Sequence, residues 1–129
     1  MKSPVSNEPM LVLELAGVEI DYCPLTHGIW LDAGELEALF DDRETADQFL
    51  ASFRPDKDCR EKKVRCPICY RKMEKVLTAG GVVIDSCQQK HGLWFDEGEL
   101  IQVLKAGHEG AESRVADLLK NMFLDHLKK

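Results

Sequence analysis

The sequence has no apolar run approaching the roughly 20 residues that a membrane-spanning helix requires. The apolar stretch 10–16 is short and interrupted by Glu14, and the residues before it lack the core of a signal peptide. Cysteines are few, five in all, and an odd number argues against a framework of disulfides. Free thiols are typical of a reducing compartment, so we expect a cytoplasmic protein that makes no contact with a membrane.

Positive charge is also scarce. The chain of 129 residues has 17 Lys and Arg against 23 Asp and Glu, a net charge of −6 at pH 7. Bulk charge of this sign disfavours nucleic acid as a partner. The segment 56–75 differs from the rest in charge, because it contains eight basic residues and only four acidic ones. A solvated charged linker is the simpler interpretation of this basic window, and a local contact with nucleic acid is the alternative.

What the sequence does contain is a repeat. Residues 20–36 read IDYCPLTHGIWLDAGEL, and residues 84–100 read IDSCQQKHGLWFDEGEL. Upstream of these, Cys66-Pro67-Ile68-Cys69 in the second copy corresponds to Ser3-Pro4-Val5-Ser6 in the first. Each copy alone is near the size at which a small fold needs a metal or a disulfide. Only the second copy has four candidate soft ligands for a metal.

Four residues of the second copy have the spacing of a zinc site, Cys66-x2-Cys69 followed, after 17 further residues, by Cys87-x3-His91. Zinc takes four such donors in a tetrahedron, and a Cys3His set fills every position with protein, which makes the ion structural. His91 is preferred as the fourth ligand because Lys90, at the x2 position, cannot easily serve. Ordinary free thiols and a redox Cys-x-x-Cys pair are the alternatives, although a redox pair favours a βαβ context that is not seen here. We predict one structural zinc held by Cys66, Cys69, Cys87 and His91.

The first copy keeps Cys23 and His27 but has Ser3 and Ser6 where the second has cysteines. Serine is a poor zinc ligand. We therefore predict that this half folds without metal, held by its hairpin, its tryptophan and the docked second half. A partial or intermolecular site that recruits Cys59 or a second chain is the alternative.

The pattern of apolar and turn residues predicts a β-hairpin in each copy, over 8–22 and 73–84. A helix follows each hairpin, because Asp32 with Glu35 and Asp96 with Glu99 have the spacing of a capping box. In such a box the aspartate accepts from backbone N–H groups of the first turn, and the glutamate reaches back to the cap. We expect the first helix to continue, with a break near 41–42, until Pro55 ends it, and the second to end at Gly107. Apolar residues at helical spacing predict a third, amphipathic helix over 111–127.

Two aromatic residues and two glycines recur at equal places in the copies. Trp30 and Trp94 are expected to form a small core beneath the knuckle and helix, and a surface aromatic that stacks on a base or clamps a peptide is the alternative. Gly28 and Gly92 are expected to supply a positive φ after the last ligand.

No residue is predicted to be catalytic. The capping-box spacing explains the four carboxylates without acid–base chemistry. His108 and His126 are isolated on helical segments, where surface or packing roles are more common than metal ligation.

At these residues the chain resembles the TFIIB-type zinc-finger family of small bacterial and archaeal proteins. The shared pattern is C-P-x-C, a hairpin ending in Ile/Leu-Asp-x-C, and G-x-W-[LF]-D-x-G-E-L after the second knuckle. The second copy matches over 66–100, and the first matches over 20–36 but departs from the pattern at Ser3 and Ser6. The resemblance implies a zinc-ribbon fold and carries over Cys66, Cys69, Cys87 and His91 as ligands. It implies a role related to transcription by name alone, and no reaction.

Together these observations predict an α+β fold of two small zinc-ribbon-like repeats, each a β-hairpin, a knuckle and a helix, with an extra C-terminal helix. The expected divisions are a metal-free repeat over 1–55, a zinc-binding repeat over 56–107 and an amphipathic helix over 108–129. The expected function is a protein-interaction or adaptor module with an unidentified protein partner. The alternative is a nucleic-acid-binding or transcription-regulatory zinc finger that acts through the basic window.

Overall fold

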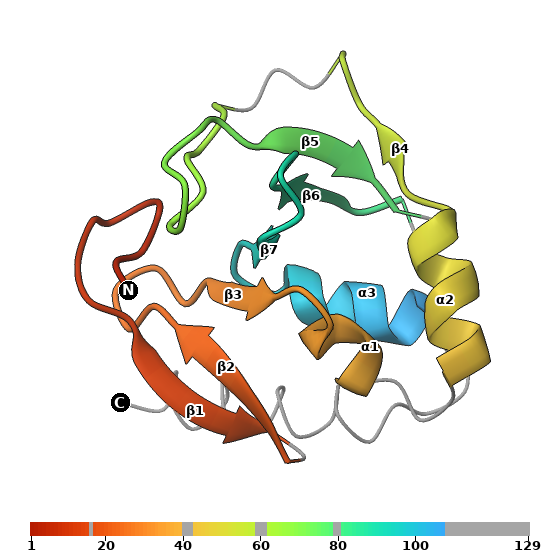
Figure 1. The fold of residues 1–129 in the computed structure, drawn as a ribbon, viewed down its shortest axis with the longest axis horizontal. Coiled ribbons are helices and arrows are strands. Elements are labelled where there is room, and N and C mark those ends of the chain that lie inside the picture. The colour runs from red at the N-terminus through yellow and green to blue at the C-terminus, as the bar shows by residue number, and fades with distance from the viewer. Residues whose placement is uncertain (16, 40–42, 59–61, 79–80, 108–129) are drawn as a thin grey trace.

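The computed structural model describes residues 1–107, apart from 16, 40–42, 59–61 and 79–80. Within these residues the strands form one antiparallel sheet in the order β1-β2-β3-β7-β6-β5-β4, and three helices accompany it (Figure 1). The fold is therefore α+β, as the sequence predicts. The elements are β1 Leu11–Leu15, β2 Val18–Tyr22, β3 Ile29–Asp32, α1 Glu35–Leu39, α2 Arg43–Ala51, β4 Arg54–Pro55, β5 Glu74–Leu77, β6 Val83–Ser86, β7 Gly92–Phe95 and α3 Glu99–Gly107.

Both predicted hairpins are present, as β1–β2 and β5–β6. Pro55, which was expected only to end a helix, lies in the short edge strand β4, where the missing N–H of proline is tolerated. The predicted third helix over 111–127, with His108 and His126, lies outside the described residues. No helix in the described ranges has the length and apolar content needed to cross a membrane.

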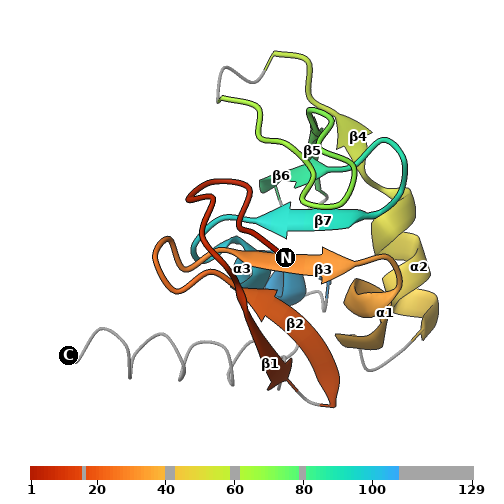
Figure 2. The ribbon, with the colours of Figure 1, turned by 60° about the vertical axis from the view of Figure 1, so that its left-hand side comes forward.

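The two halves of the chain meet where β3 pairs with β7. These strands run side by side in opposite directions (Figure 2), with Trp30 directly across from Trp94. On either side of this pair the order is the same, β2 then β1 in the first half and β6 then β5 in the second. One continuous sheet thus joins the halves, and no separate sheet exists for either within the described residues.

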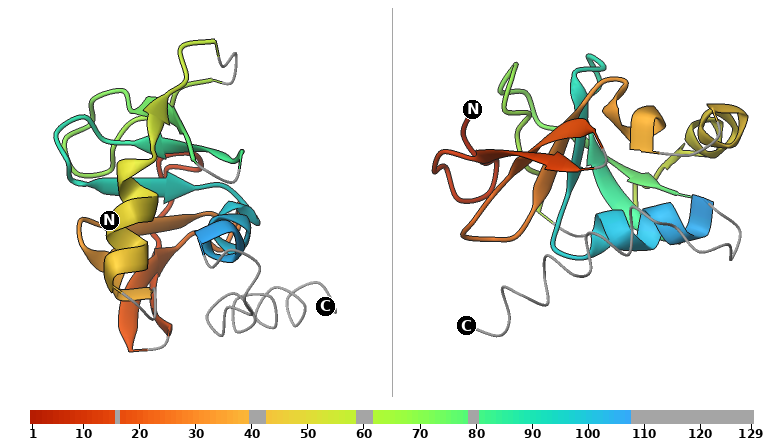
Figure 3. Two further views of the ribbon diagram at one scale, coloured as in Figure 1. Left: turned by 90° about the vertical axis from the view of Figure 1, so that its right-hand side faces the viewer. Right: turned by 90° about the horizontal axis from the view of Figure 1, so that it is seen from below.

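The sheet is covered on both faces, and alternate residues of the central strands go to different clusters. Ile29 and Leu31 of β3 join a cluster that includes apolar residues of α1 and α3, on the side where the helices gather (Figure 3). Trp30, between them, joins a second cluster made by residues of the knuckles. A strand sends successive side chains to opposite faces, so the fully buried run of β3 places each face against its own core. The second cluster contains Met10, Cys23, Trp30, Cys66, Met73, Cys87 and Trp94.

The tryptophans pack across the boundary between the halves, in a cluster with residues of both copies. Both are fully buried. A Cβ atom on Gly28 would overlap the ring of Trp94, and a Cβ on Gly92 would overlap the ring of Trp30 and the carbonyl oxygen of Leu31. The expected core of tryptophans at the knuckles is therefore present, and it is shared by the two copies.

The role expected for the two knuckle glycines was wrong. Neither Gly28 nor Gly92 has a positive φ; the preceding His27 (63°) and the nearby Lys90 (63°) have it instead. These glycines are required because nothing larger than a hydrogen fits between the backbone and the partner tryptophan.

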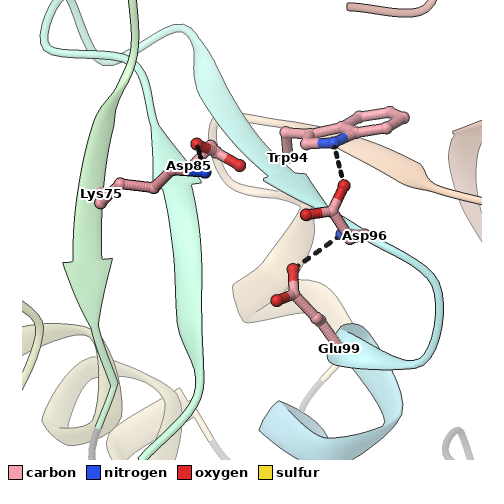
Figure 4. Close-up of polar contacts among 5 residues, drawn as sticks. All are labelled: Lys75, Asp85, Trp94, Asp96 and Glu99. Carbon is pink, nitrogen blue, oxygen red and sulfur yellow. Dashed lines mark hydrogen bonds and ion pairs between the residues drawn. The ribbon is translucent and has the colours of Figure 1, made fainter. Parts of the chain in front are cut away.

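The carboxylates at the helix starts bind the sheet to the helices. Glu35 Oε1 accepts from the backbone N–H of Asp32 at 2.6 Å, and Glu99 Oε1 accepts from Asp96 at 2.8 Å. The aspartates have a partner that was not expected, because Asp96 Oδ1 accepts from the indole N–H of Trp94 at 3.0 Å (Figure 4). Asp32 does the same for Trp30 at 2.8 Å. Each indole N–H is thereby satisfied in a buried site, and the carboxylates have a structural use.

A buried ion pair that was not predicted from the sequence joins β5 to β6. Lys75 Nζ lies 2.8 Å from Asp85 Oδ1, and both side chains are almost fully buried (Figure 4). The two residues are direct partners in the sheet register. Removal of one partner would leave an uncompensated charge in the interior, so the two residues depend on each other.

The Gly–Trp contacts can be tested by a double-mutant cycle. Gly28→Ala is expected to destabilise the protein by about 1–3 kcal/mol, because overpacking displaces a buried ring. The penalty is expected to shrink in a Trp94→Phe background, which lacks the indole atoms that the new Cβ meets. Denaturant unfolding of the wild type, the two single variants and the double variant measures the change in this penalty.

Gly92→Ala provides the matched comparison. Its Cβ meets the Leu31 carbonyl oxygen as well as the ring, so Trp30→Phe is not expected to relieve it. Equal relief at both glycines, or none at Gly28, would contradict this account of the contacts.

Candidate metal centre

The structure brings the four predicted residues together, from two separate turns. Cys66 and Cys69 lie in the knuckle before β5, and Cys87 and His91 lie in the knuckle between β6 and β7. Their donor atoms all lie within 4.8 Å of one another. The Sγ atoms of Cys69 and Cys87 are 3.7 Å apart, and His91 Nδ1 lies 3.5 Å from Cys87 Sγ and 3.9 Å from Cys66 Sγ.

These separations fit a single ion of the size of zinc. With Zn–S of about 2.3 Å and Zn–N of about 2.0–2.1 Å, a regular tetrahedron has S···S edges of about 3.8 Å and S···N edges of about 3.6 Å. The separations in the structure differ from these by a few tenths of an ångström. The 3.7 Å between sulfurs is far beyond a disulfide bond, and all four described cysteines are free. Nδ1 is the imidazole atom that faces the thiols.

The backbone of each knuckle is shaped for this purpose. In the first, the N–H of Tyr70 donates to the carbonyl of Cys66 at 2.8 Å, and Tyr70 has a positive φ of 62°. In the second, Lys90 donates to the carbonyl of Cys87 at 3.0 Å. The N–H of Ile68 points at Cys66 Sγ, 3.3 Å away, as a donor to a thiolate would. The turns thus present two donors each without a regular helix or strand.

The thiols differ in how readily they lose a proton. A backbone N–H hydrogen bond at Arg71 lowers the pKa of Cys69 to about 7, whereas burial raises the pKa of Cys66 to about 11. A bound cation would stabilise both thiolates, since metal binding releases the thiol protons. Cys66 and Cys87 are nearly inaccessible to water, and Cys69 and His91 are half-buried. A tetrahedron filled by four protein donors in such a place is a structural site.

Both turns of the first copy have the form of the turn 66–70 and carry different side chains. The N–H of Asn7 donates to the carbonyl of Ser3 and that of His27 to Cys23, each with a positive φ at the fifth residue. The turn 23–27 differs in this from its counterpart in the repeat, where the positive φ lies at the fourth residue, Lys90, and its fourth residue, Thr26, has the place that Cys69 has in 66–70. His27 occupies the positive-φ position, and its Nδ1 is hydrogen-bonded to the Tyr22 hydroxyl at 2.7 Å. The sequence comparison of His27 with His91 missed this correspondence.

Hydroxyl groups surround the remaining thiol of the first copy. Ser6 Oγ lies 3.4 Å from Cys23 Sγ, and Ser3 Oγ accepts from the backbone N–H groups of Val5 and Ser6, each at 3.3 Å. Burial raises the pKa of the Cys23 thiol, but the hydrogen bonds outweigh it and lower the pKa to about 7. Ser3, Ser6, Cys23 and Thr26 thus have the turn positions that four ligands would take. The signal for Thr26 was present in the sequence, because CPLT at 23–26 has the same pattern as CPIC at 66–69.

Among the described residues, Cys66, Cys69, Cys87 and His91 are the group of possible ligands close enough to hold an ion. The metal-free state of the first copy stays a prediction, and Cys59 lies outside the described residues.

Comparison with known proteins agrees with this geometry. The family model described as transcription factor zinc-finger, of the TFIIB zinc-ribbon type, matches two segments of the chain, residues 4–42 and 65–106. The two segments correspond to the two copies, and together with the Cys3His cluster they confirm the prediction of one structural zinc. Neither the curated proteins nor the solved structures contain a significant match.

Loss of the metal is expected to affect the two copies unequally. Cys66→Ser should abolish zinc binding and unfold at least the second half, because zinc supplies on the order of 10 kcal/mol in small zinc folds. Cys23→Ser should leave one zinc per chain. Elemental analysis and thermal unfolding measure both effects, and two zincs per wild-type chain would contradict the prediction.

The place assigned to Thr26 predicts that a second metal site can be restored. Ser3→Cys, Ser6→Cys and Thr26→Cys together with Cys23 should bind a second Co²⁺ with the absorption of four thiolates. The matched control replaces His27 instead of Thr26 and should not complete a tetrahedron. Equal cobalt uptake by both triple variants would show that the knuckle register is wrong.

Proposed function

The chain belongs to the transcription factor zinc-finger family of the TFIIB type, and from that membership we propose that it is a zinc-stabilised interaction module that holds a segment of a protein partner. The observation that carries the proposal is the filled Cys3His tetrahedron. Four protein donors leave no coordination position for a substrate or a nucleophilic water, so the ion shapes the protein and performs no chemistry. The function then resides in the surfaces that the metal holds in place.

One such surface is an open groove beside the zinc site. It has a volume of about 590 Å³, within the range of sites that hold small ligands or peptide side chains. Leu36, Leu50, Phe53 and Leu93 give it an apolar lining, with Glu37 among the polar residues at its edge. It lies where the start of α1 and the end of α2 meet the knuckle between β6 and β7.

The groove depends on the metal because the zinc knuckle forms part of its wall. Cys87 and Lys90 line it together with residues of the first half. The N–H of Ala33 donates to the carbonyl of His91 at 3.0 Å, which ties the α1 start to the same knuckle. Loss of zinc would therefore alter the groove as well as the fold. A short apolar segment of a partner, with its polar backbone toward Glu37 and Lys90, is the occupant that suits this lining.

We place this activity in the cytoplasm, where free thiolates and zinc coexist with a reducing glutathione pool. The family description makes a protein of the transcription apparatus the first partner to examine. Membership of a family is weaker support for that partner than the groove is for the mode of binding.

Short peptides selected from a displayed library against the zinc-loaded protein test the groove. We expect the selected sequences to be apolar. The variant Ala33→Glu/Ala51→Glu should lower their affinity for the protein at least about ten-fold, which corresponds to about 1.4 kcal/mol of binding free energy. Both alanines line the groove and are exposed, and glutamate already occupies the position of Ala33 in the second copy, as Glu97.

Ala38→Glu is the control. Ala38 is exposed on α1 but does not line the groove, so this variant should bind the peptides as the wild type does. Peptides that bind all variants equally, or that bind after zinc is removed, would show that the groove is not the site.

A further inference from the structure

A second surface lies between one knuckle from each copy. The loop of residues 2–7 and the loop of residues 62–70 lie next to each other (Figure 1) and flank a cleft of about 380 Å³. This cleft and the apolar groove have no lining residue in common. The residues that line the cleft are Lys2, Ser3, Pro4, Val5, Asn7, Lys62, Lys63, Val64, Arg65, Cys66, Pro67 and Tyr70.

Both walls of the cleft are held by backbone hydrogen bonds. On one side the N–H of Ser3 donates to the carbonyl of Glu8 at 2.8 Å. On the other, the N–H of Cys66 donates to Arg71 at 2.9 Å and that of Met73 to Val64 at 2.8 Å. The second wall is also tied to the metal centre through Cys66. The cleft is therefore a preformed feature of the folded, zinc-loaded protein.

The charge of the cleft is opposite to that of the molecule. Among the described residues, the cations Lys2, Lys62, Lys63 and Arg65 line it and no carboxylate does, although the chain carries a net charge of −6. Arg65 is positioned, because its guanidinium donates to the carbonyl of Tyr70 at 3.0 Å. A local positive concavity of this kind attracts anions, and phosphates in particular bind to Lys and Arg.

An exposed aromatic ring stands beside these cations. The Tyr70 side chain is 69% exposed, so it adds nothing to either core. Its backbone has φ of 62°, a conformation that is unfavourable for a bulky residue, whereas the first copy has Asn at the corresponding position. The chain thus keeps a costly tyrosine where asparagine would suit the turn. A ring so placed can stack on a nucleobase, which contributes about 1–3 kcal/mol per base.

From these observations we infer that the cleft binds single-stranded nucleic acid, with phosphates at the cations and a base on Tyr70. A single strand fits better than a duplex, because its bases are unpaired and expose the faces that can stack on Tyr70. An acidic peptide would use the cations but would leave the exposed ring without a role. This activity is additional to the apolar groove and does not depend on it.

Fluorescence anisotropy of the full-length, zinc-loaded protein with a labelled single-stranded oligonucleotide tests the inference. With four phosphates neutralised, the slope of log K against log salt is expected near about −3, so binding should weaken roughly fifty-fold between about 50 and 200 mM salt. Tyr70→Asn should weaken binding about ten-fold at unchanged slope, and its turn is compatible with the fold because Asn7 occupies the same position.

Lys62→Ala/Lys63→Ala should lower both the affinity and the salt slope, by about 1.4 in slope for two phosphates. The matched control, Lys57→Ala/Arg71→Ala, removes two cations of the same basic window that do not line the cleft, and it should lower the slope less. Zinc content verifies that each variant is folded.

Three results would overturn the inference. Absence of binding at low salt is the first, and equal effects of the cleft pair and the control pair are the second. The third is equal binding of a duplex or of a poly-glutamate peptide together with no effect of Tyr70→Asn. Failure here would leave the peptide groove untouched, and failure of the groove would leave the oligonucleotide titration untouched, since the two sets of variants do not overlap.

Discussion

The fold depends on the close approach of two strands that come from different halves of the chain. At the centre of the sheet, Trp30 and Trp94 lie opposite each other, and each ring occupies space that a side chain on Gly92 or Gly28 would fill. The indole N–H groups are then fixed by Asp32 and Asp96, whose own backbone groups are capped by the helix-start glutamates. One reciprocal contact thus sets the strand register, the position of the knuckles and the direction in which the helices leave the sheet.

The two knuckle pairs are held in different ways on nearly the same backbone. In the second copy, four donors lie at the edge lengths of a zinc tetrahedron, and metal binding contributes on the order of 10 kcal/mol. In the first, the Ser6 hydroxyl lies 3.4 Å from the Cys23 thiol. A neutral hydrogen bond contributes about 1 kcal/mol net, so this contact stabilises far less than an ion would. We predict that the first copy needs no metal, because the shared sheet and the tryptophan contacts already fix its position.

Local features of the structure could be predicted from the sequence, and contacts between the halves could not. Short segments of sequence, through residue propensity and ligand chemistry, determine the hairpins and the glutamate contacts at the helix starts. The same holds for the spacing of the ligands Cys66, Cys69, Cys87 and His91. The role of Gly28 was mistaken because the atom that excludes a side chain there belongs to Trp94, 66 residues away. Thr26 was missed because His27, unlike threonine, is a common metal ligand and was therefore compared with His91. The similarity of CPLT at 23–26 to CPIC at 66–69 was visible in the sequence. The Lys75–Asp85 pair needed the sheet register before either charge had a partner.

The position of the metal also has a physical logic if the groove and the cleft are the binding surfaces. Zinc knuckle residues line both, Cys87 and Lys90 in the groove and Cys66 and Tyr70 in the cleft, whereas the first copy lends the cleft only its 2–7 loop. A surface that must keep its shape when a ligand binds gains affinity from rigidity, since less order is imposed at the moment of binding. Side chains that are held by hydrogen bonds alone can move at a cost of a few kcal/mol. Four bonds to one ion hold their ligands more rigidly. On this argument an ion is most useful in the second copy, where both knuckles line a binding surface, and we expect less need for one beside the knuckle 23–27, which lines neither the groove nor the cleft.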